Sequence, residues 1–194
     1  MPADPTDTAL MIAVRDRGDA TAFETLAFRW DQRLVKYLTK LTGDVQVACD
    51  LRQETLIRVW RSASTYDDSY AFATWVTRIA TNLARTHVAR RQILNSRIAT
   101  LDGAAGLHFS GESSALNRAI ESEQSITLRE TLDTLPAPEK ELLLMRFQLG
   151  LTYGEIALVT ATPESTVKSR MSALLRRLRK QMEESGLTRS CIKL

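Results

Sequence analysis

The sequence predicts an all-α protein in which two small helical domains are joined by a flexible linker, and the second domain contains a helix-turn-helix. Apolar residues recur three or four positions apart before residue 92 and again after residue 126. Between these stretches the helical period is lost, and no segment shows the sustained alternation typical of a strand. We therefore expect a first domain over residues 1–94, a linker over 95–125 and a second domain over 126–194.

The composition is that of an ordinary globular protein and excludes several classes. The chain is 44% hydrophobic and 25% charged. Its two cysteines, Cys49 and Cys191, are far apart and lack metal-ligand spacing, so neither a disulfide framework nor a zinc site is expected. The N-terminus has no apolar signal-peptide core, and no apolar run is long enough to span a membrane. We expect a cytoplasmic protein without a metal or a cofactor.

Residues suited to helix ends predict where the first helix begins and where it stops. Two prolines and two acids indicate a frayed tail over residues 1–8. Asp19 is suited to cap an amphipathic helix that runs from Ala20 to about Leu41. Gly43 is suited to the left-handed backbone position that ends this helix.

Two further helices complete the expected first domain. Asp44 can cap a helix from about Val45 to Arg61. Its buried side is expected to consist of apolar residues, namely Val47, Ala48, Leu51, Leu56, Val59 and Trp60. The polar segment 64–70 is predicted to be a loop, and a third helix is predicted from Phe72 to about Gln92.

The second domain is predicted from a proline, a glycine and a short turn. Pro138 is suited to the first turn of a helix that Gly150 ends. Its core residues are expected to be Leu142, Leu143, Met145 and Phe147. A short helix over about 153–159 is then followed by a second helix, with Thr162 as its cap and Pro163 at its first position. Two short helices joined by so tight a turn are typical of a DNA-binding helix-turn-helix.

Positive charge gathers in two parts of the chain. No acid occurs from Ser69 to Leu101, a span that contains Arg78, Arg85, Arg90, Arg91 and Arg97. No acid occurs from Ser165 to Gln181 either, and a more acidic stretch separates the two spans. This distribution suggests two contacts with a polyanion, and the alternative is two ordinary solvent-exposed helix faces.

The last helix has one apolar side and one polar side. At about 100° per residue, Val167, Met171, Leu174 and Leu178 fall within a narrow arc that must pack inward. The opposite side carries Ser165, Ser169, Ser172 and Arg176, with Lys168 and Lys180 toward its edges. Arginine and lysine can donate to guanine edges, and small serines let a helix sit deep in the major groove. The pattern predicts DNA binding.

Four motifs in this order and spacing resemble bacterial RNA polymerase sigma factors of the extracytoplasmic-function (ECF) group. They are "RGDATAFETL" at 17–26, "TGDVQVACDLRQETLIRVW" at 42–60, "FATWVTRIATNLARTHVARR" at 72–91 and "LTYGEIALVTATPESTVKSRM" at 151–171. The resemblance covers about residues 10–91 and 126–180.

The resemblance implies a protein that is not an enzyme. Such a factor joins core RNA polymerase, directs it to promoters and helps to open the start-site duplex. The first domain would bind core polymerase and the −10 element, and the second would read the −35 element. The partners implied are core RNA polymerase, promoter DNA and an anti-sigma factor.

For polymerase binding, the resemblance points to the segment "DLRQE" at 50–54 and to Ile57, about one helical turn further along. The residues carried over to this contact are Asp50, Leu51, Gln53, Glu54 and Ile57. Charged groups around an apolar patch are typical of a protein interface. Cys49 stands where the family usually has an acid, and Arg52 stands where an aliphatic residue is common, so both are expected to adjust this contact.

For the −10 element, the resemblance points to the loop "STYDDSYAF" and the helix after it. A loop with aromatic and polar groups can hold an unstacked base, and Tyr66 and Tyr70 are the candidates. Trp75 is expected in the core. The helix is expected to contact promoter bases and backbone through a polar face formed by Arg78, Asn82 and Arg85, and phosphates through Arg90 and Arg91.

For the −35 element, the resemblance points to the helix after the turn. The residues carried over are Ser165, Thr166, Lys168, Ser169, Arg170, Ser172, Arg176 and Arg177. The family often has an Arg-Ala-Arg pattern where this chain has Ala173, Leu174 and Leu175. Ala173 therefore removes one expected contact, which Arg176 and Arg177 are expected to replace.

Two other classes of function remain open at this point. A stand-alone regulator would bind duplex DNA without polymerase, but it would not need the first domain. An enzyme would need a catalytic constellation, and the chain has no phosphate-binding loop, no metal-ligand cluster and only two histidines, His87 and His108, neither in a recognisable catalytic setting.

Overall fold

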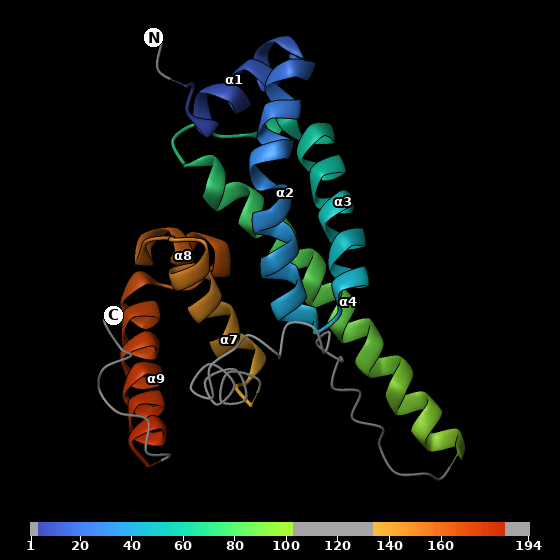
Figure 1. Cartoon of the computed structure of the whole chain (residues 1–194), viewed down its shortest axis with the longest axis vertical. Helices are drawn as coiled ribbons and strands as arrows, with labels where there is room; N and C mark the ends of the chain where they lie inside the picture. Colours follow the sequence, from blue (N-terminus) through green and yellow to red (C-terminus); the bar gives the residue numbers. More distant parts are fainter. Residues whose placement is uncertain (1–3, 103–133, 185–194) are drawn as a thin grey trace, which may run out of the picture. The chain divides into compact units, whose positions relative to one another are not determined.

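The computed structural model describes residues 4–102 and 134–184, and every regular element in these ranges is helical (Figure 1). The prediction of an all-α fold is confirmed for these residues. The chain divides into two compact units, Met1–Gly111 and Glu112–Leu194. The part of the expected linker beyond residue 102 lies outside the described residues.

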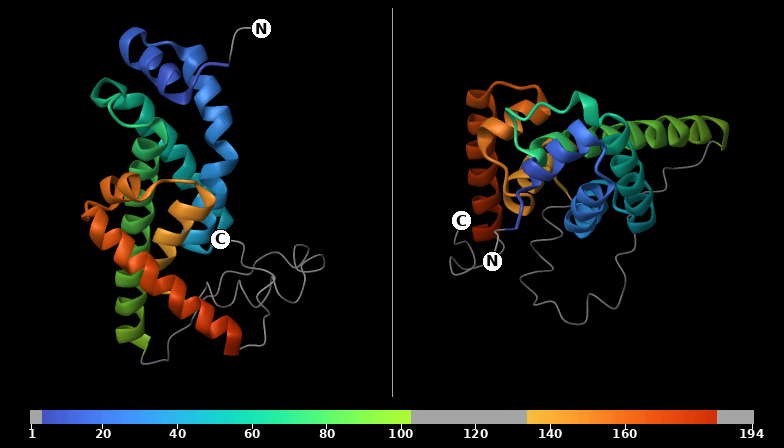
Figure 2. Two further views of the ribbon diagram at one scale, coloured as in Figure 1. Left: turned by 90° about the vertical axis from the view of Figure 1, so that its left-hand side faces the viewer. Right: turned by 90° about the horizontal axis from the view of Figure 1, so that it is seen from above.

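Unit 1 is a bundle of helices in which α2 lies along α3 and both pack on α4 (Figures 1 and 2). Its elements are α1 Asp7–Arg17, α2 Ala20–Thr42, α3 Val45–Arg61, the short 3₁₀ helix η1 Ala63–Thr65 and α4 Phe72–Asp102. The predicted caps are confirmed. Asp19 accepts the Ala22 amide at 3.0 Å, and Asp44 accepts the amides that open α3. Gly43 ends α2 with a φ of 76°.

The core of unit 1 is built on large side chains from α2 and α4. Trp30, Tyr37 and Phe72 are each at most 2% exposed. Burial of side chains of this size contributes roughly 1.5–3 kcal/mol each. The Tyr37 hydroxyl lies 2.8 Å from the Thr81 hydroxyl, so the phenol retains a hydrogen bond inside the core.

The N-terminal segment is ordered, so the prediction of a frayed tail over residues 1–8 is wrong from residue 4 onward. The Thr6 hydroxyl caps α1 by accepting the Ala9 amide at 3.2 Å. Asp7 accepts from the Trp30 indole and from the Arg29 guanidinium, each at 2.8 Å. Arg29 also donates to the Pro5 carbonyl at 2.8 Å. Contacts with α2, distant in the sequence, therefore hold this segment in place.

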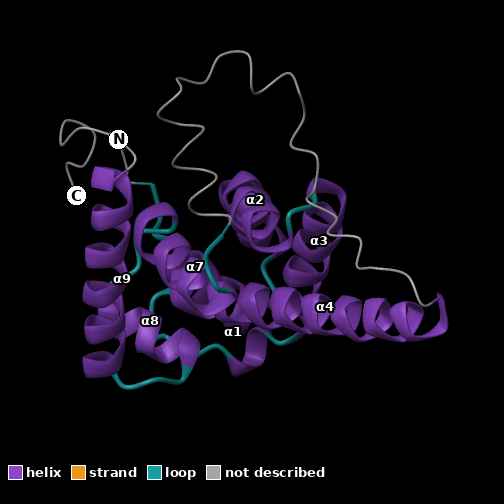
Figure 3. Ribbon diagram, turned by 90° about the horizontal axis from the view of Figure 1, so that it is seen from below, coloured by secondary structure: helices purple, strands orange, loops and turns teal. Residues whose placement is uncertain are grey.

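Helix α4 extends ten residues beyond the predicted end at Gln92, as far as Asp102. Its last turns run past the ends of α2 and α3, which Figure 3 shows most clearly. Neither glycine nor proline interrupts the sequence until Gly103, so no local signal stops the helix earlier. Ile93 and Leu94 are 53% and 58% exposed because this stretch has left the core of the bundle.

Unit 2 contains α7 Ala137–Leu143, a π-helical turn η2 Leu144–Gln148, α8 Tyr153–Thr160 and α9 Glu164–Glu184. Pro138 lies in the first turn of α7, as predicted. The prediction that Phe147 is a core residue is wrong, since its side chain is 48% exposed. Phe147 falls within the wider π turn, which changes the angular position of its side chain relative to a regular α-helix.

The turn between α8 and α9 differs from its prediction in two details. Ala161 adopts a φ of 52°, a left-handed conformation that ends α8. Thr162 lies one position before the residue that caps α9, and its hydroxyl donates back to the Thr160 carbonyl at 3.2 Å. The Pro163 carbonyl accepts the Val167 amide, and α9 begins at Glu164. Proline therefore stands one position earlier in the helix than predicted.

Candidate nucleic-acid interface

Helix α9 presents a polar face to solvent. Its apolar stripe packs inward as predicted, since Val167, Met171, Leu174 and Leu178 are at most 8% exposed. The opposite face is exposed and carries Ser165, Ser169, Ser172 and Arg176. Arg170 is exposed as well, whereas Thr166 is half-buried. This face combines small hydroxyl side chains with guanidinium groups, a combination that suits a DNA major groove.

Two of the predicted DNA-binding cations on α9 are engaged in ion pairs. Lys168 contacts Glu164 one turn earlier at 2.7 Å and remains exposed. Arg177 forms a two-point ion pair with Glu139 of α7, with one of its contacts at 3.1 Å. The hydrogen bonds to Glu139 raise the pKa of the Arg177 guanidinium. Arg177 therefore ties α9 to α7, while its side chain stays 46% exposed and its DNA contact stays a prediction.

Local polar contacts hold α8, the first helix of the helix-turn-helix, in place. Thr152 and Glu155 form a reciprocal capping box at its start. Arg146 lies over the Tyr153 ring, 4.9 Å from its centroid, and donates to the Leu151 carbonyl at 3.0 Å. These contacts hold the helix-turn-helix against the end of the π turn.

In unit 1, the loop between η1 and α4 is closed by hydrogen bonds. Tyr66 is 3% exposed, and its hydroxyl donates to the Tyr70 carbonyl at 2.8 Å. Burial raises the pKa of the Tyr66 phenol. The prediction that Tyr66 contacts a base is corrected, because the ring belongs to an aromatic cluster with Phe72 and Trp75. Tyr70 is 45% exposed and is the aromatic ring that the loop offers to a ligand.

The acidic tip of this loop is also internally bonded. Asp67 accepts the Ser69 amide at 3.0 Å and the Ser69 hydroxyl. These hydrogen bonds lower the pKa of the Asp67 carboxyl. Arg15 of α1 reaches the same loop, where it donates to the Tyr66 carbonyl at 3.1 Å and lies 3.5 Å from Asp68.

Helix α4 continues from this loop with a polar face. Arg78, Asn82 and Arg85 are exposed and recur at helical spacing, on the side opposite the buried Val76 and Ala80. Further along, Arg90 is exposed and Arg91 is half-buried. The structure thus brings the exposed Tyr70 to the start of a helix whose open face carries cations and an amide.

Helix α3 has an exposed face of mixed character. Asp50, Gln53 and Ile57 are exposed, and Ala48 and Val59 on the other side are buried. Two more predicted residues flank this face, since Leu51 is half-buried and Glu54 pairs with Arg58 at 2.7 Å.

Trp60 joins the exposed part of α3, contrary to the prediction that it is buried. Its side chain is 41% exposed, and its ring lies against Phe23 with a centroid separation of 5.0 Å. The two rings are tilted by 58°, and part of the indole stays exposed. An exposed tryptophan beside polar groups is a frequent energetic centre of protein interfaces.

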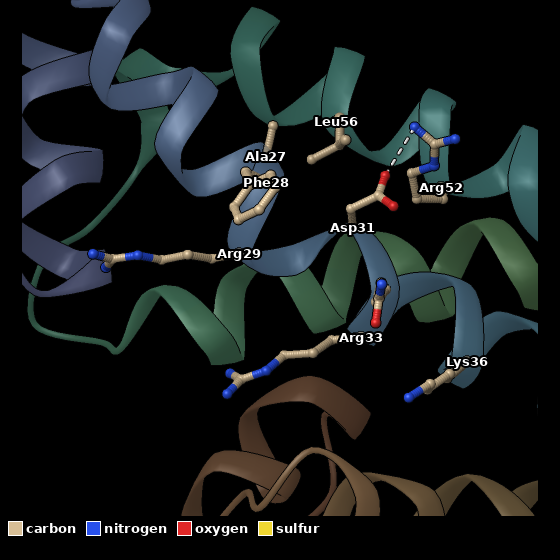
Figure 4. Close-up of a pocket in the computed structure, with 9 residues that line it drawn as sticks. Ala27, Phe28, Arg29, Asp31, Arg33, Lys36, Arg52 and Leu56 are labelled. Carbon is tan, nitrogen blue, oxygen red and sulfur yellow. Dashed lines mark ion pairs between the residues drawn. The ribbon is translucent and has the colours of Figure 1, made fainter.

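A groove of about 640 Å³ runs between α2 and α3 (Figure 4). Its apolar part includes Phe28, which is 86% exposed, and Leu56. Arg52 crosses from α3 to Asp31 of α2 at 3.2 Å. Four cations line it, namely Arg29, Arg33, Lys36 and Arg52, of which Arg29 pairs with Asp7 and Arg52 with Asp31. Such a surface favours an acidic partner.

The described parts of the chain lack two other kinds of feature. No group of three or more metal-ligating side chains comes together there. Within the same residues, no helix has the length and apolar character needed to span a membrane.

Comparison with known proteins identifies the family of the chain. Two family models match the chain, "Sigma-70 region 2" at residues 26–93 and "Sigma-70, region 4" at residues 125–178. RNA polymerase sigma-H factor of Pseudomonas aeruginosa is 32% identical over 160 residues, which cover 80% of this chain and 83% of that protein. ECF RNA polymerase sigma-E factor of Haemophilus influenzae is 30% identical over 171 residues, which cover 86% and 89%.

This protein belongs to the ECF group of RNA polymerase sigma factors. It is a promoter-specific factor for transcription initiation, in a family whose members are not enzymes. Its fold is shared with the sigma factor RpoE of Bartonella quintana, whose structure was solved with the anti-sigma factor NepR. That structure has a TM-score of 0.65 and 19% identity, and the match covers 84% of this chain and 98% of that one.

The two matched regions of the sigma factor coincide with the surfaces described above. The region 2 match covers α2 from Leu26 onward, then α3, the Tyr66–Tyr70 loop and α4 as far as Ile93. The region 4 match covers α7, α8 and α9 as far as Leu178. Helix α1, with Arg15, precedes the region 2 match.

Sequence reasoning missed three features of the sigma factor that bear on its surfaces. Arg15 was not predicted to touch the loop, Phe28 was not predicted to be exposed, and Trp60 was assigned to the core. Helical periodicity could have separated Trp60 from Val59, which is fully buried one position earlier. The contact of Arg15 with a loop 51 positions later leaves no local signal in the sequence.

Proposed function

We propose that this sigma factor divides its work between its two units. Unit 1 binds core RNA polymerase through α3 and the −10 element through the Tyr66–Tyr70 loop and α4. Unit 2 binds the −35 element through α9. The observation that carries the proposal is the exposed Tyr70 ring at the start of the cationic α4 face. An aromatic ring beside cations is what binding of an unstacked strand requires.

For the −10 element, we assign base contact to Tyr70 and strand contact to Arg78, Asn82 and Arg85. Stacking of a base on an aromatic ring contributes roughly 1–3 kcal/mol. Arg90 and Arg91, farther along the helix, contact phosphates. Tyr66 supports the loop from inside, because it is buried and bonded to the Tyr70 carbonyl.

For the −35 element, we assign the groove-facing role to the exposed side of α9. Its members are Ser165, Ser169, Arg170, Ser172 and Arg176, with Thr166 and Lys168 at the rim. Arg176 is the strongest candidate for a base contact, since it is exposed and lies on the face opposite the buried stripe. Arg177 holds the helix through Glu139 instead.

For core polymerase, we assign the contact to the exposed face of α3. Asp50, Gln53 and Glu54 supply polar groups, and Ile57 and Trp60 supply exposed apolar area. A mixture of this kind that includes an exposed aromatic residue is typical of protein interfaces. Leu51 supports this face from a half-buried position.

We infer in addition that an anti-sigma factor regulates the protein, and that it acts in the bacterial cytoplasm, where polymerase and promoters are. Support comes from the similar fold of RpoE, which was solved with the anti-sigma factor NepR. The groove between α2 and α3 suits an acidic amphipathic segment of such a partner, because its lining combines the exposed Phe28 with several cations.

The division of work is tested with promoters altered in one element at a time. A promoter is first mapped by reconstituted polymerase on genomic DNA of the source bacterium. Arg176→Ala should make transcription insensitive to changes in the −35 element while keeping its sensitivity to the −10 element. Asn82→Ala should make transcription insensitive to changes in the −10 element while keeping its sensitivity to the −35 element. If both variants lose sensitivity to the same element, the assignment of the two units is wrong.

A further inference from the structure

We propose that Arg15 of α1 is a positioning residue for the loop that reads the −10 element. The proposal rests on the proposed function of that loop, and it extends the recognition apparatus to a helix outside the region 2 match. In this role Arg15 touches no DNA and acts through Tyr66, Asp68 and, across the loop, Tyr70.

The contacts of Arg15 reach the loop at two points. One guanidinium nitrogen donates to the Tyr66 carbonyl at 3.1 Å and lies 3.5 Å from the Asp68 carboxylate. The side chain is only 23% exposed, so the surrounding protein holds it in this position. The guanidinium presents this nitrogen to the loop and its Nε to Asp16 at the same time, which a lysine ammonium, with a single nitrogen, cannot do with the same geometry.

The guanidinium is itself oriented from the opposite side. Its Nε donates to Asp16 at 2.7 Å, and this bond is the main reason that the pKa of Arg15 is raised. Arg15 also lies in the last turn of α1, where the exposed carbonyls of a helix favour a cation. The charge is therefore held in place before any DNA arrives.

Tyr66 connects the two sides of the loop through one hydrogen bond at its backbone and one at its side chain. Arg15 holds its backbone carbonyl, and its phenol hydroxyl holds the Tyr70 carbonyl at 2.8 Å. Tyr66 is thus fixed at both ends, while the Tyr70 ring stays 45% exposed. Fixing the loop in advance lowers the entropy lost when a strand binds.

Arg15 has a second, electrostatic effect on the loop. Asp67 and Asp68 place two carboxylates beside the surface that is proposed to meet a polyanion. Arg15 neutralises Asp68 in part, which reduces repulsion between the loop and phosphates.

The test compares three variants in reconstituted transcription from a mapped promoter and from derivatives with single −10 substitutions. Arg15→Ala should lower discrimination between the parent and substituted −10 elements by about tenfold, as expected for loss of a charged hydrogen bond that positions the loop. Arg15→Lys should restore only part of this discrimination, because it keeps the charge and loses the planar fork. Arg17→Ala removes an exposed cation from the same turn and should leave discrimination unchanged.

Two further measurements separate the possible failures. Melting temperature and affinity for core polymerase should be similar for Arg15→Ala and Arg17→Ala, so that a change in −10 discrimination is not a change in folding. Tyr70→Ala reports on the proposed loop itself. If Tyr70→Ala abolishes discrimination and Arg15→Ala does not affect it, Arg15 has no positioning role. If Tyr70→Ala also leaves −10 discrimination unchanged, the proposed function of the loop is wrong. The positioning role of Arg15 is then wrong as well.

Discussion

Arg177 and Glu139 form a two-point ion pair that joins α9 to α7, whereas the neighbouring Arg176 points to solvent from the same helix. Adjacent arginines in one acid-free span therefore have different surroundings. The structure shows that Arg177 is engaged by an acid on another helix. The positive charge of this span is only partly available to DNA.

The two arginines should respond differently to removal. Arg176→Ala should weaken binding to a −35 duplex by about tenfold or more and leave the melting temperature unchanged, as expected for a lost base or phosphate contact. Arg177→Ala should lower the melting temperature of unit 2 and affect DNA binding less. Fluorescence anisotropy with duplex DNA and calorimetry measure the two effects. Equal loss of DNA affinity in both variants would contradict the separate roles.

The exposed face of α3 should control affinity for polymerase. Gln53→Ala combined with Glu54→Ala should weaken binding to core polymerase by about tenfold, since interface residues of this kind contribute on the order of 1–2 kcal/mol. The helix content should not change, because both side chains lie outside the core. Glu24→Ala on α2, an exposed residue of the same charge as Glu54, is the control. Normal polymerase affinity in the double variant would remove the assignment of this face.

Two buried threonines of α4 offer a matched pair for stability. The Thr77 hydroxyl has no hydrogen-bond partner among the described residues, whereas the Thr81 hydroxyl bonds to Tyr37 at 2.8 Å. Thr77→Val should leave stability unchanged or raise it by up to about 1 kcal/mol, because it removes an unpaired polar atom. Thr81→Val should lower stability by about 1–3 kcal/mol. Urea denaturation measures both, and the opposite order would contradict these hydrogen-bond assignments.

The turn of the helix-turn-helix carries conformational strain at Ala161. Its φ of 52° lies in the left-handed region, which is unfavourable for any residue with a Cβ. Ala161→Gly should therefore stabilise the protein by about 0.5–1 kcal/mol, after allowance for the greater freedom of glycine in the unfolded chain. Ala157→Gly, within α8, should destabilise it by a similar amount. Destabilisation by both changes would show that Ala161 is not strained.

The order of the Tyr66–Tyr70 loop should depend on pH through Asp67. Hydrogen bonds from Ser69 lower the pKa of Asp67 in the folded protein. A lowered pKa means that this stabilisation is present above the pKa of the unfolded chain and is lost as the pH falls through the folded value. The Ser69 amide resonance should therefore be constant near neutral pH and shift on acidification, and Asp67→Asn should remove this titration. A shift centred near neutral pH would contradict the assignment.

Caps and apolar stripes were predictable because they depend on neighbours in the chain. Asp19, Gly43 and Asp44 end or begin helices through bonds to residues within four positions, and all three predictions are confirmed. The stripe of α9 follows from helical geometry alone, so its burial was predicted as well.

Features that depend on distant residues were not predictable in this way. Tyr66 is buried because α1 and the aromatic residues of α4 cover it, and Trp60 stays partly exposed with its ring against Phe23 of α2. Arg177 is engaged because Glu139, 38 positions earlier, lies beside it. Each of these outcomes depends on tertiary packing that the helical period does not contain.

The most direct test of the account is transcription by purified core RNA polymerase with this protein on fragmented genomic DNA of the source bacterium. We expect a stable complex with core polymerase and new start sites that share a −10 and a −35 element. We also expect Gln53→Ala with Glu54→Ala to reduce all of these transcripts together. Tight binding to duplex DNA without polymerase binding or new start sites would contradict it.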